Sequence, residues 1–422
     1  MIQKELHDCF CRSNDKLSDW YCRQLNTVQF PIYSSYDIRD SGFKIANVDG
    51  NIYPAGFNNI CNTDQDYAGE IFQRYVHNHY GKGVRKILLV PEEHTNNPYY
   101  WDNVIVIQKL LQDGGFTVKV AAAQNFATPW QLTSAKGHAI TVGSAWPTQD
   151  DIRNFAPDLI LSNNDFSDPH LEWWKAWSDS GLTQAINPPR ELGWYQRKKS
   201  RYFHHYNELV TQFTSLIQED PFLLSVRTQV APLVMDDDAQ MHRLAEQVET
   251  MLSELRQDYA KRKINSEPFV FIKNNAGTYG LAVVRVGSAQ EVLEWNYKSR
   301  KKMKAAKGGR EVTEVILQEG VPSRIQSDGV TAEPVVYMIG SDLAGGFLRT
   351  HAEKNSTESL NSPGAIYKRL CVSDLNISIE GHPLENVYGW TARLGLLAMA
   401  LEAKEMQVQF LGYKAAPNVE SV

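Results

Sequence analysis

Residues 269–286 read FVFIKNNAGTYGLAVVRV, two apolar runs separated by a short turn that contains two glycines. Two strands joined by such a turn let backbone N–H groups point toward a polyphosphate, and a lysine at the end of the first strand adds a positive charge. The stretch therefore predicts a phosphate-binding hairpin made of Lys273, Gly277, Thr278, Tyr279 and Gly280. It is not a P-loop, which needs GxxxxGK followed by a helix. An ordinary glycine hairpin has the same letters, so that alternative stays open.

Further candidates for nucleotide and metal binding follow this hairpin in the chain. The run VILQEG ends in Gln318, Glu319 and Gly320, where exposed backbone groups could pair with an adenine edge. The simpler interpretation is a strand that ends in a turn. Downstream, carboxylate and amide oxygens of the kind that Mg²⁺ prefers are supplied by Glu333, Glu358 and Asn361. Between these strands, the basic segment 297–310 is either a solvated helix and loop or a lid over anionic phosphates.

The first half of the chain alternates between strand and helix patterns. The apolar runs at 86–90, 118–123, 158–162 and 184–186 are bounded by glycine, proline and asparagine, and residues 103–111 fit a helix that ends at Gly114 and Gly115. This alternation predicts a parallel sheet, whose ligands gather at the carboxyl ends of the strands. Residues 239–262 fit one long amphipathic helix, and a β-rich α+β part follows it.

Composition excludes several classes of protein. The 422 residues carry a formal charge of −6, which argues against an electrostatic nucleic-acid binder. The longest apolar stretch, Leu394 to Leu401, is far shorter than the roughly 18 residues of a membrane span and predicts a buried helix. The first residues lack a hydrophobic signal segment, so we expect a cytoplasmic protein with no membrane partner. Five cysteines without metal-binding spacing predict free thiols.

The order of these motifs from 187 to about 370 resembles the ATP-grasp superfamily. The segment NPPRELGWYQRKKSRYF, residues 187–203, is similar to the part of bacterial glutathione synthetases that carries a first phosphate-binding lysine, here Lys199 with Lys198 as the competitor. Over most of the chain the sequence resembles a minor bacterial family of glutamate-cysteine ligases with an ATP-grasp-like fold. The segments that carry this resemblance are 41–59, 89–97, 159–167, 193–200, 271–280, 315–321, 332–339 and 345–365.

The resemblance implies an α/β and α+β fold: an N-terminal substrate domain at 1–199 and an ATP-grasp domain at 200–422, with a lid at about 265–312. It also implies ATP-dependent joining of the glutamate γ-carboxylate to cysteine through an acyl phosphate, with Mg²⁺, in the first step of glutathione synthesis. Lys273 and Arg349 would be catalytic, the latter stabilising the transferred phosphoryl group. The polar segments offered as amino-acid contacts are Asn58, Asn59, His94, Asn97, Asn163, Asn164 and Asp165. Asparagines at loop ends also form turns, which is the alternative for these positions.

The sequence departs from the family pattern beside the glycine turn. Asn274 and Asn275 stand where the family has Ala-Asp, and Ala282 stands where it has glycine. Two alternatives therefore remain: an ATP-grasp ligase for another carboxylate and amine, and a catalytically weakened nucleotide-binding homologue. The sequence makes no prediction of oligomeric state.

Overall fold

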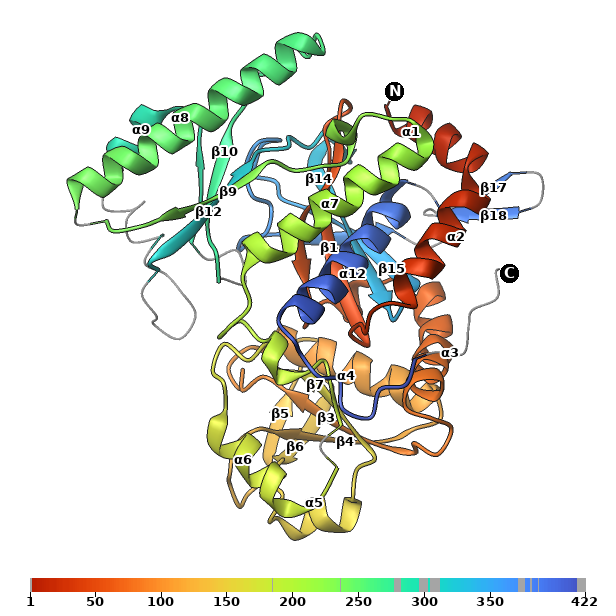
Figure 1. Ribbon diagram of the computed structural model, residues 1–422. Coiled ribbons are helices and arrows are strands. Elements are labelled where there is room, and N and C mark those ends of the chain that lie inside the picture. The colour runs from red at the N-terminus through yellow and green to blue at the C-terminus, as the bar shows by residue number, and fades with distance from the viewer. Residues whose placement is uncertain are drawn as a thin grey trace.

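The computed structural model describes residues 2–183, 185–235, 237–276, 282–295, 303, 312–370, 376–379, 382–385 and 387–415. The predicted phosphate contacts Gly277, Thr278, Tyr279 and Gly280 lie outside the described residues, as does nearly all of the basic segment 297–310. Figure 1 shows a mixed sheet at one end of the molecule, a central sheet, a smaller sheet beside it, and a separate two-stranded sheet. No helix among the described residues is long and apolar enough to cross a membrane.

The mixed sheet has the strand order β5-β6-β4-β3-β7-β8, and its neighbours β4, β3, β7 and β8 run parallel. Its strands are β3 (Lys86–Pro91), β4 (Thr117–Ala122), β5 (Trp130–Thr133), β6 (Ala139–Ser144), β7 (Leu159–Asn163) and β8 (Ile186–Asn187), and its helices are α4 (Pro98–Asp113), α5 (Asp150–Phe155) and α6 (Leu171–Ser180). Residues 87–90 are fully buried because helices follow the parallel strands. Gly114 caps α4 as predicted, and Gly115 adopts a φ of +86°, which favours glycine. The predicted parallel sheet is confirmed.

The central sheet is antiparallel and combines strands from both ends of the chain in the order β16-β15-β14-β1-β2. Its strands are β1 (Tyr33–Asp40), β2 (Ile45–Asn51), β13 (Gln326–Ser327), β14 (Val330–Ile339), β15 (Asp342–Thr350) and β16 (Ile366–Leu370). The helices of this part are α1 (Ile2–Arg12), α2 (Asn14–Leu25), α3 (Asn62–His79), α7 (Lys199–Ile217) and α12 (Val387–Glu405), where α12 contains the predicted buried helix. The central sheet draws strands from both sides of residue 199. The division of the chain into two domains at that residue stays a prediction.

The smaller sheet has the order β11-β10-β12-β9 and its own hydrophobic core. It consists of β9 (Thr228–Pro232), β10 (Val270–Asn274), β11 (Val283–Val286) and β12 (Glu314–Glu319), with α8 (Asp238–Lys261) and α9 (Ala289–Leu293) on one face (Figure 1). Leu244, Val248 and Leu252 lie at helical spacing on α8 and are buried against the sheet. The long amphipathic helix and the strands around 269–272 and 315–318 are confirmed, and with them the α/β and α+β fold class expected of an ATP-grasp-like protein.

Short elements complete the described part of the chain. The remaining elements are η1 (Phe57–Asn59), η2 (Arg190–Leu192), η3 (Pro221–Leu223), β17 (Asn376–Ile379) and β18 (His382–Glu385).

Cys9, Cys11 and Cys22 are free thiols as predicted. Cys61 is disulfide-bonded, so the prediction of five free thiols is wrong. Spacing along the chain carries no information about a disulfide between distant segments, which only the fold brings together.

Candidate functional site

Two adjoining cavities lie where the central and small sheets meet the start of α7. The first cavity is lined by predicted site residues from five separate segments: Lys199, Lys273, Gln318, Glu319, Glu333 and Asn361. The second cavity is lined by Asn59, Asp165 and Arg349, with aromatic walls from Tyr53, Trp194, Tyr337, Phe347 and Tyr367. Both cavities share Asp37, Asp49 and Asn361, so a ligand in one would meet a ligand in the other at these residues.

Two lysines and one aspartate form the positive end of the first cavity. Lys199 Nζ lies 2.5 Å from Asp49 Oδ1, and Lys273 Nζ donates to the Val48 carbonyl at 3.1 Å. Burial lowers the pKa of Lys273 to about 8, although Asp49 opposes this shift. Burial alone would raise the pKa of Asp49, but the ammonium groups of Lys199 and Lys273 more than offset it and lower that pKa. At this end of the cavity, two lysine side chains therefore lie near a single ionised carboxylate, that of Asp49.

The structure separates the two competing lysines at the start of α7. Lys199 lines the cavity, whereas Lys198 pairs with Glu314 at 2.9 Å and is absent from the lining. Asn275 fixes this arrangement: its carbonyl accepts from the Lys199 N–H at 2.7 Å and its Oδ1 accepts from the Ser200 N–H at 2.8 Å. Asn275 thus caps the N-terminus of α7, where backbone donors need partners. The Asn275 side chain therefore has a structural function here.

The other departure from the family pattern, Ala282, is conformationally strained. It has a φ of +49° and is completely buried. The left-handed region favours glycine because a Cβ crowds the backbone there. The position therefore has the backbone that the family glycine would suit, and this chain accepts a methyl group in its place.

The end of β12 presents Gln318 to the first cavity. Its side chain is fully buried, and Nε2 donates to the Val48 carbonyl at 3.1 Å. Its Oε1 has no hydrogen-bond partner among the described residues. A buried acceptor without a partner costs free energy, which a ligand donor in the cavity would recover.

The backbone groups expected to face an adenine are partly occupied. The Glu319 N–H donates to the Arg227 carbonyl and the Gly320 N–H donates to the Phe269 carbonyl, both at 2.8 Å. The Glu319 carboxylate is paired with buried Lys44 at 2.6 Å. Val321 follows and lines the cavity, so the sequence prediction of 318–320 placed the segment correctly but missed this neighbour.

A buried network of two arginines and two carboxylates separates the cavities. Arg349 Nη1 lies 2.7 Å from both Asp37 Oδ2 and Glu333 Oε1, and Arg39 Nε lies 2.5 Å from Glu333 Oε2. Burial would raise the pKa of Glu333, but the two guanidinium groups lower it overall. Burial by itself would lower the pKa of Arg349, but the carboxylates of Asp37 and Glu333 more than offset this effect and raise that pKa. Arg349 Nε is buried with no acceptor among the described residues, which leaves one donor for a ligand.

Sequence reasoning missed Asp37, Arg39 and Asp49. All three lie on β1 and β2, and Asp37 and Arg39 are two residues apart, on the same face of their strand. Charged residues repeated with period two in an otherwise strand-like run were the available signal, because one face of a strand can line a polar cavity.

The predicted amino-acid contacts divide into two groups. Asn59 and Asp165 line the second cavity, and Asn58 Nδ2 donates to Asn59 Oδ1 at 3.3 Å. The others lie outside the lining of both cavities and have partners within the protein: His94 with Glu92 at 2.7 Å, Asn97 at the start of α4, Asn163 with the Pro54 carbonyl, and Asn164 with the Phe166 N–H. Asn97 caps a helix and Asn164 forms a turn, whereas Asn163 is buried and bonds to a segment that is distant in sequence.

The predicted metal ligands are also only partly assembled. Glu333 and Asn361 line the first cavity. Glu358 instead accepts from Lys354 Nζ and from the Asn355 N–H, both at 3.0 Å. Within the described part of the chain, no group of three or more His, Cys, Asp or Glu residues could hold a metal ion.

The chain is similar to known proteins over nearly its whole length. A family model described as glutamate-cysteine ligase matches residues 7–403. A crystal structure from Methylobacillus flagellatus KT, provisionally described as gamma-glutamylcysteine synthetase, is 32% identical, covers 95% of this chain and 96% of its own, and has a TM-score of 0.79. D-cycloserine synthetase DcsG is 13% identical, covers 77% of this chain and 82% of its own, and has a TM-score of 0.37. No curated protein matches.

Proposed function

Because the chain belongs to the glutamate-cysteine ligase family, we propose that its first cavity binds ATP and its second cavity binds the glutamate that becomes γ-glutamylcysteine. The observation that carries this assignment is the junction of the cavities. Asp37, Asp49 and Asn361 line both, with Lys199 and Lys273 on one side and Arg349 on the other. A γ-phosphate at that junction would face a carboxylate from the second cavity, as acyl phosphate formation requires.

Charge neutralisation is the main task of the first cavity. Lys199 and Lys273 would contact the ATP phosphates; Asp49 holds the Lys199 ammonium and the Val48 carbonyl holds that of Lys273 before ATP arrives. Fixed cations lower the cost of the charge that develops during phosphoryl transfer, because they need no reorganisation at the moment of reaction. Lys199 also lies at the N-terminus of α7, where the helix dipole adds positive potential.

Adenine would lie against the end of β12 in the first cavity. The unpartnered Gln318 Oε1 can accept from an exocyclic amine, and Val321 and Phe271 supply apolar walls. A base that donates to Gln318 removes the cost of a buried acceptor, so this contact favours a purine with an amino group.

The second cavity combines a donor with apolar walls. Arg349 Nε can donate to the glutamate γ-carboxylate or to the acyl phosphate made from it. Asn59 and Asp165 are placed to contact the polar end of an amino acid, since an α-ammonium group prefers a carboxylate. The aromatic side chains would exclude water, which otherwise hydrolyses an acyl phosphate.

We propose that Mg²⁺ binds together with ATP beside Glu333 and Asn361, which line the first cavity. This ion commonly takes one or two protein oxygens and completes its octahedron with phosphates and water. Glu333 would supply a carboxylate, Asn361 an amide oxygen, and Glu358 a third ligand if its carboxylate left Lys354. Bound there, Mg²⁺ would neutralise phosphate charge. We also place the enzyme in the cytoplasm, where ATP, glutamate and free cysteine are available.

The test is ADP release with ATP and Mg²⁺ and with glutamate, cysteine, both, or neither. We expect slow release with glutamate alone, faster release with both amino acids, and a product with the mass of γ-glutamylcysteine. Faster release with aspartate or a preformed dipeptide would mean that the enzyme joins another carboxylate and amine. ATP binding without stimulation by any amino acid would identify a weakened homologue instead.

A further inference from the structure

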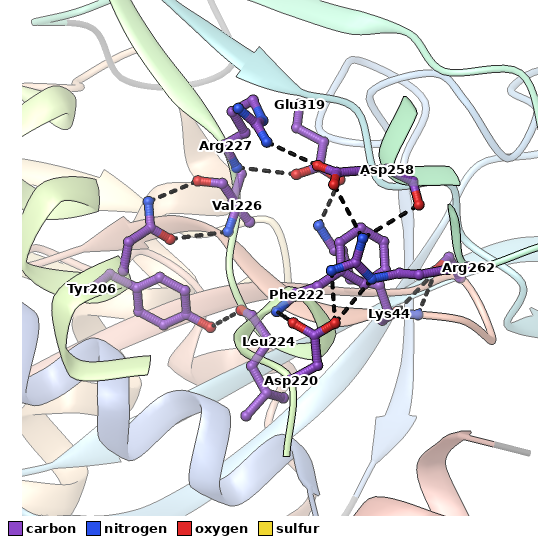
Figure 2. Close-up of polar contacts among 12 residues, drawn as sticks. Lys44, Tyr206, Asp220, Phe222, Leu224, Val226, Arg227, Asp258, Arg262 and Glu319 are labelled. Carbon is purple, nitrogen blue, oxygen red and sulfur yellow. Dashed lines mark hydrogen bonds and ion pairs between the residues drawn. The ribbon is translucent and has the colours of Figure 1, made fainter. Parts of the chain in front are cut away.

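A buried ion pair lies behind the proposed ATP site, on the side of β12 away from Gln318. Lys44 Nζ and Glu319 Oε1 are 2.6 Å apart, and the two side chains are 1% and 2% exposed. Figure 2 shows this pair among Phe222, Arg227, Asp258 and Arg262. We call these six residues the Lys44 cluster. Consecutive residues of a strand point to opposite faces, so Gln318 faces the cavity while Glu319 faces this cluster.

The cluster joins parts of the fold that are distant in sequence. Lys44 lies in the turn between β1 and β2 of the central sheet, and Glu319 ends β12 of the small sheet. The Phe222 ring lies between Lys44 Nζ, 4.0 Å from its centroid, and the Arg262 guanidinium at 4.1 Å. Arg262 in turn pairs with Asp220 at 2.6 Å and with Asp258 at 3.1 Å. Lys44 therefore connects the central sheet to the sheet that carries the proposed adenine contacts.

Glu319 is in turn hydrogen-bonded to the backbone of Arg227 beside its own strand. Its Oε2 accepts from the Arg227 N–H at 3.0 Å, while its own N–H donates to the Arg227 carbonyl at 2.8 Å. Arg227 is further held by Glu254 at 2.7 Å and Asp258 at 2.8 Å, both on α8. The side chain that Lys44 fixes thus holds the backbone immediately after Gln318.

A second connection runs in parallel on the cavity side. The Val48 carbonyl of β2 accepts from both Gln318 Nε2 and Lys273 Nζ at 3.1 Å. The hairpin of β1 and β2 therefore contacts β12 at two points, one on each face. Movement of this hairpin would shift the direction of Gln318 and the position of Lys273 together.

Stability alone is a poor explanation for such a pair. Desolvating two charges costs about as much free energy as their attraction returns, and apolar residues of similar volume often serve equally well. Charged pairs retained in a protein interior are better attested as devices that fix one register or orientation. Here the segment so oriented is the one that would read the nucleotide.

We propose that Lys44 is a positioning residue for ATP: through Glu319 it sets the orientation of residues 318–321, and thereby ATP affinity, without contacting a substrate. The inference rests on the proposed function of the first cavity. It differs from a structural role in one respect. Loss of Lys44 should weaken ATP specifically, whereas general destabilisation would affect both substrates.

The experiment compares Lys44→Met and Lys44→Arg with a surface control, Lys109→Met, whose lysine pairs with Asp113 and is 61% exposed. We expect Lys44→Met to raise both the KM and the calorimetric Kd for Mg·ATP by about tenfold, within the usual range of coupling between sites. The KM for glutamate and the kcat should stay within about twofold of the wild-type values, a change far smaller than the expected effect on ATP. Lys44→Arg keeps the charge and should recover most of the ATP affinity, and Lys109→Met should match wild type throughout.

Several outcomes would overturn the inference. A lower melting temperature with unchanged ATP Kd would make Lys44 structural only, and equal rises in the KM for ATP and glutamate would remove its selectivity for the nucleotide. If Lys44→Met does not fold, Arg262→Met replaces it, because Arg262 holds the other face of the Phe222 ring that Lys44 contacts, and an unchanged ATP Kd in Arg262→Met contradicts the proposal. If wild type binds ATP but lacks ligase activity, the calorimetric arm still decides the role of Lys44. If wild type does not bind ATP, the proposed function fails first and this inference with it.

Discussion

Replacing Lys273 by methionine should lower activity and at the same time stabilise the fold. Lys273 is the next-to-last residue of β10, lines the first cavity, and donates a hydrogen bond to the Val48 carbonyl. A charge-assisted hydrogen bond to a phosphate contributes about 1.5 to 3 kcal/mol. Its loss should lower kcat/KM for ATP by about 10- to 150-fold, since about 1.4 kcal/mol is a factor of ten.

The stability change has the opposite sign because burial of the ammonium is unfavourable. The pKa of Lys273 falls from its ordinary 10.5 to about 8 on folding. At about 1.4 kcal/mol per tenfold change in proton affinity, this corresponds to at most about 3.5 kcal/mol of stability lost by the wild type below pH 8. Solvent in the open cavity reduces the figure, so we expect methionine to raise the free energy of unfolding by about 1 to 3 kcal/mol at pH 7.

The pH dependence follows from proton binding. Between about pH 8 and 10.5 the unfolded chain keeps the lysine proton and the folded chain has lost it. The unfolded state then binds more protons, so wild-type stability rises with pH in this window. Lys273→Met lacks this rise. Its advantage should therefore be largest below pH 8 and disappear toward pH 10.5.

The assay combines ADP release with urea unfolding of wild type, Lys273→Met and the control Lys109→Met at pH 7 and pH 10. Unchanged turnover in Lys273→Met would remove the phosphate role. A variant that is less stable than wild type at pH 7 would show that the lysine supports the fold and would refute the charge argument.

Three further predictions concern the same cavities. First, log kcat/KM for ATP should fall above about pH 8 as Lys273 loses its proton, whereas log kcat, measured at saturating ATP, should fall only at higher pH because bound phosphates favour the ammonium; a flat kcat/KM profile from pH 7 to 9 would contradict it. Second, Asn361→Ala should raise the Mg²⁺ concentration for half-maximal rate several-fold, and Glu358→Gln should raise it less because Lys354 already holds that carboxylate; a Mg²⁺ titration that is identical in all forms would refute the metal assignment. Third, Asn163→Ala should lower stability by about 1 to 3 kcal/mol for each buried partner left unpaired while the KM for glutamate stays within about twofold, and a large KM increase would instead return Asn163 to the substrate site.

Local sequence signals determined much of this protein. The runs at 86–90 and 118–123, the helix at 239–262 and the glycine pair after α4 specify their elements through spacing and backbone preference, which act over a few residues. For the same reason the segments that carry Lys199, Lys273 and Gln318 could be recognised along the chain, and these three residues line one cavity. Asn97 and Asn164 were ambiguous because a cap and a ligand contact use the same side chain.

Only the tertiary structure decided which side chains meet. Asp49 and Lys199 are 150 positions apart, Asp37 and Arg349 312, and Lys44 and Glu319 275, yet each pair is within hydrogen-bond distance. No periodicity extends over such separations, since it reports which face of its own element a residue occupies and not which element packs on that face. Antiparallel pairing of β1 with β14 brings Asp37 beside Val335 and thus close to Glu333 and Arg349. The charge network between the cavities is therefore a product of strand order, which hydrophobic burial across the whole chain selects.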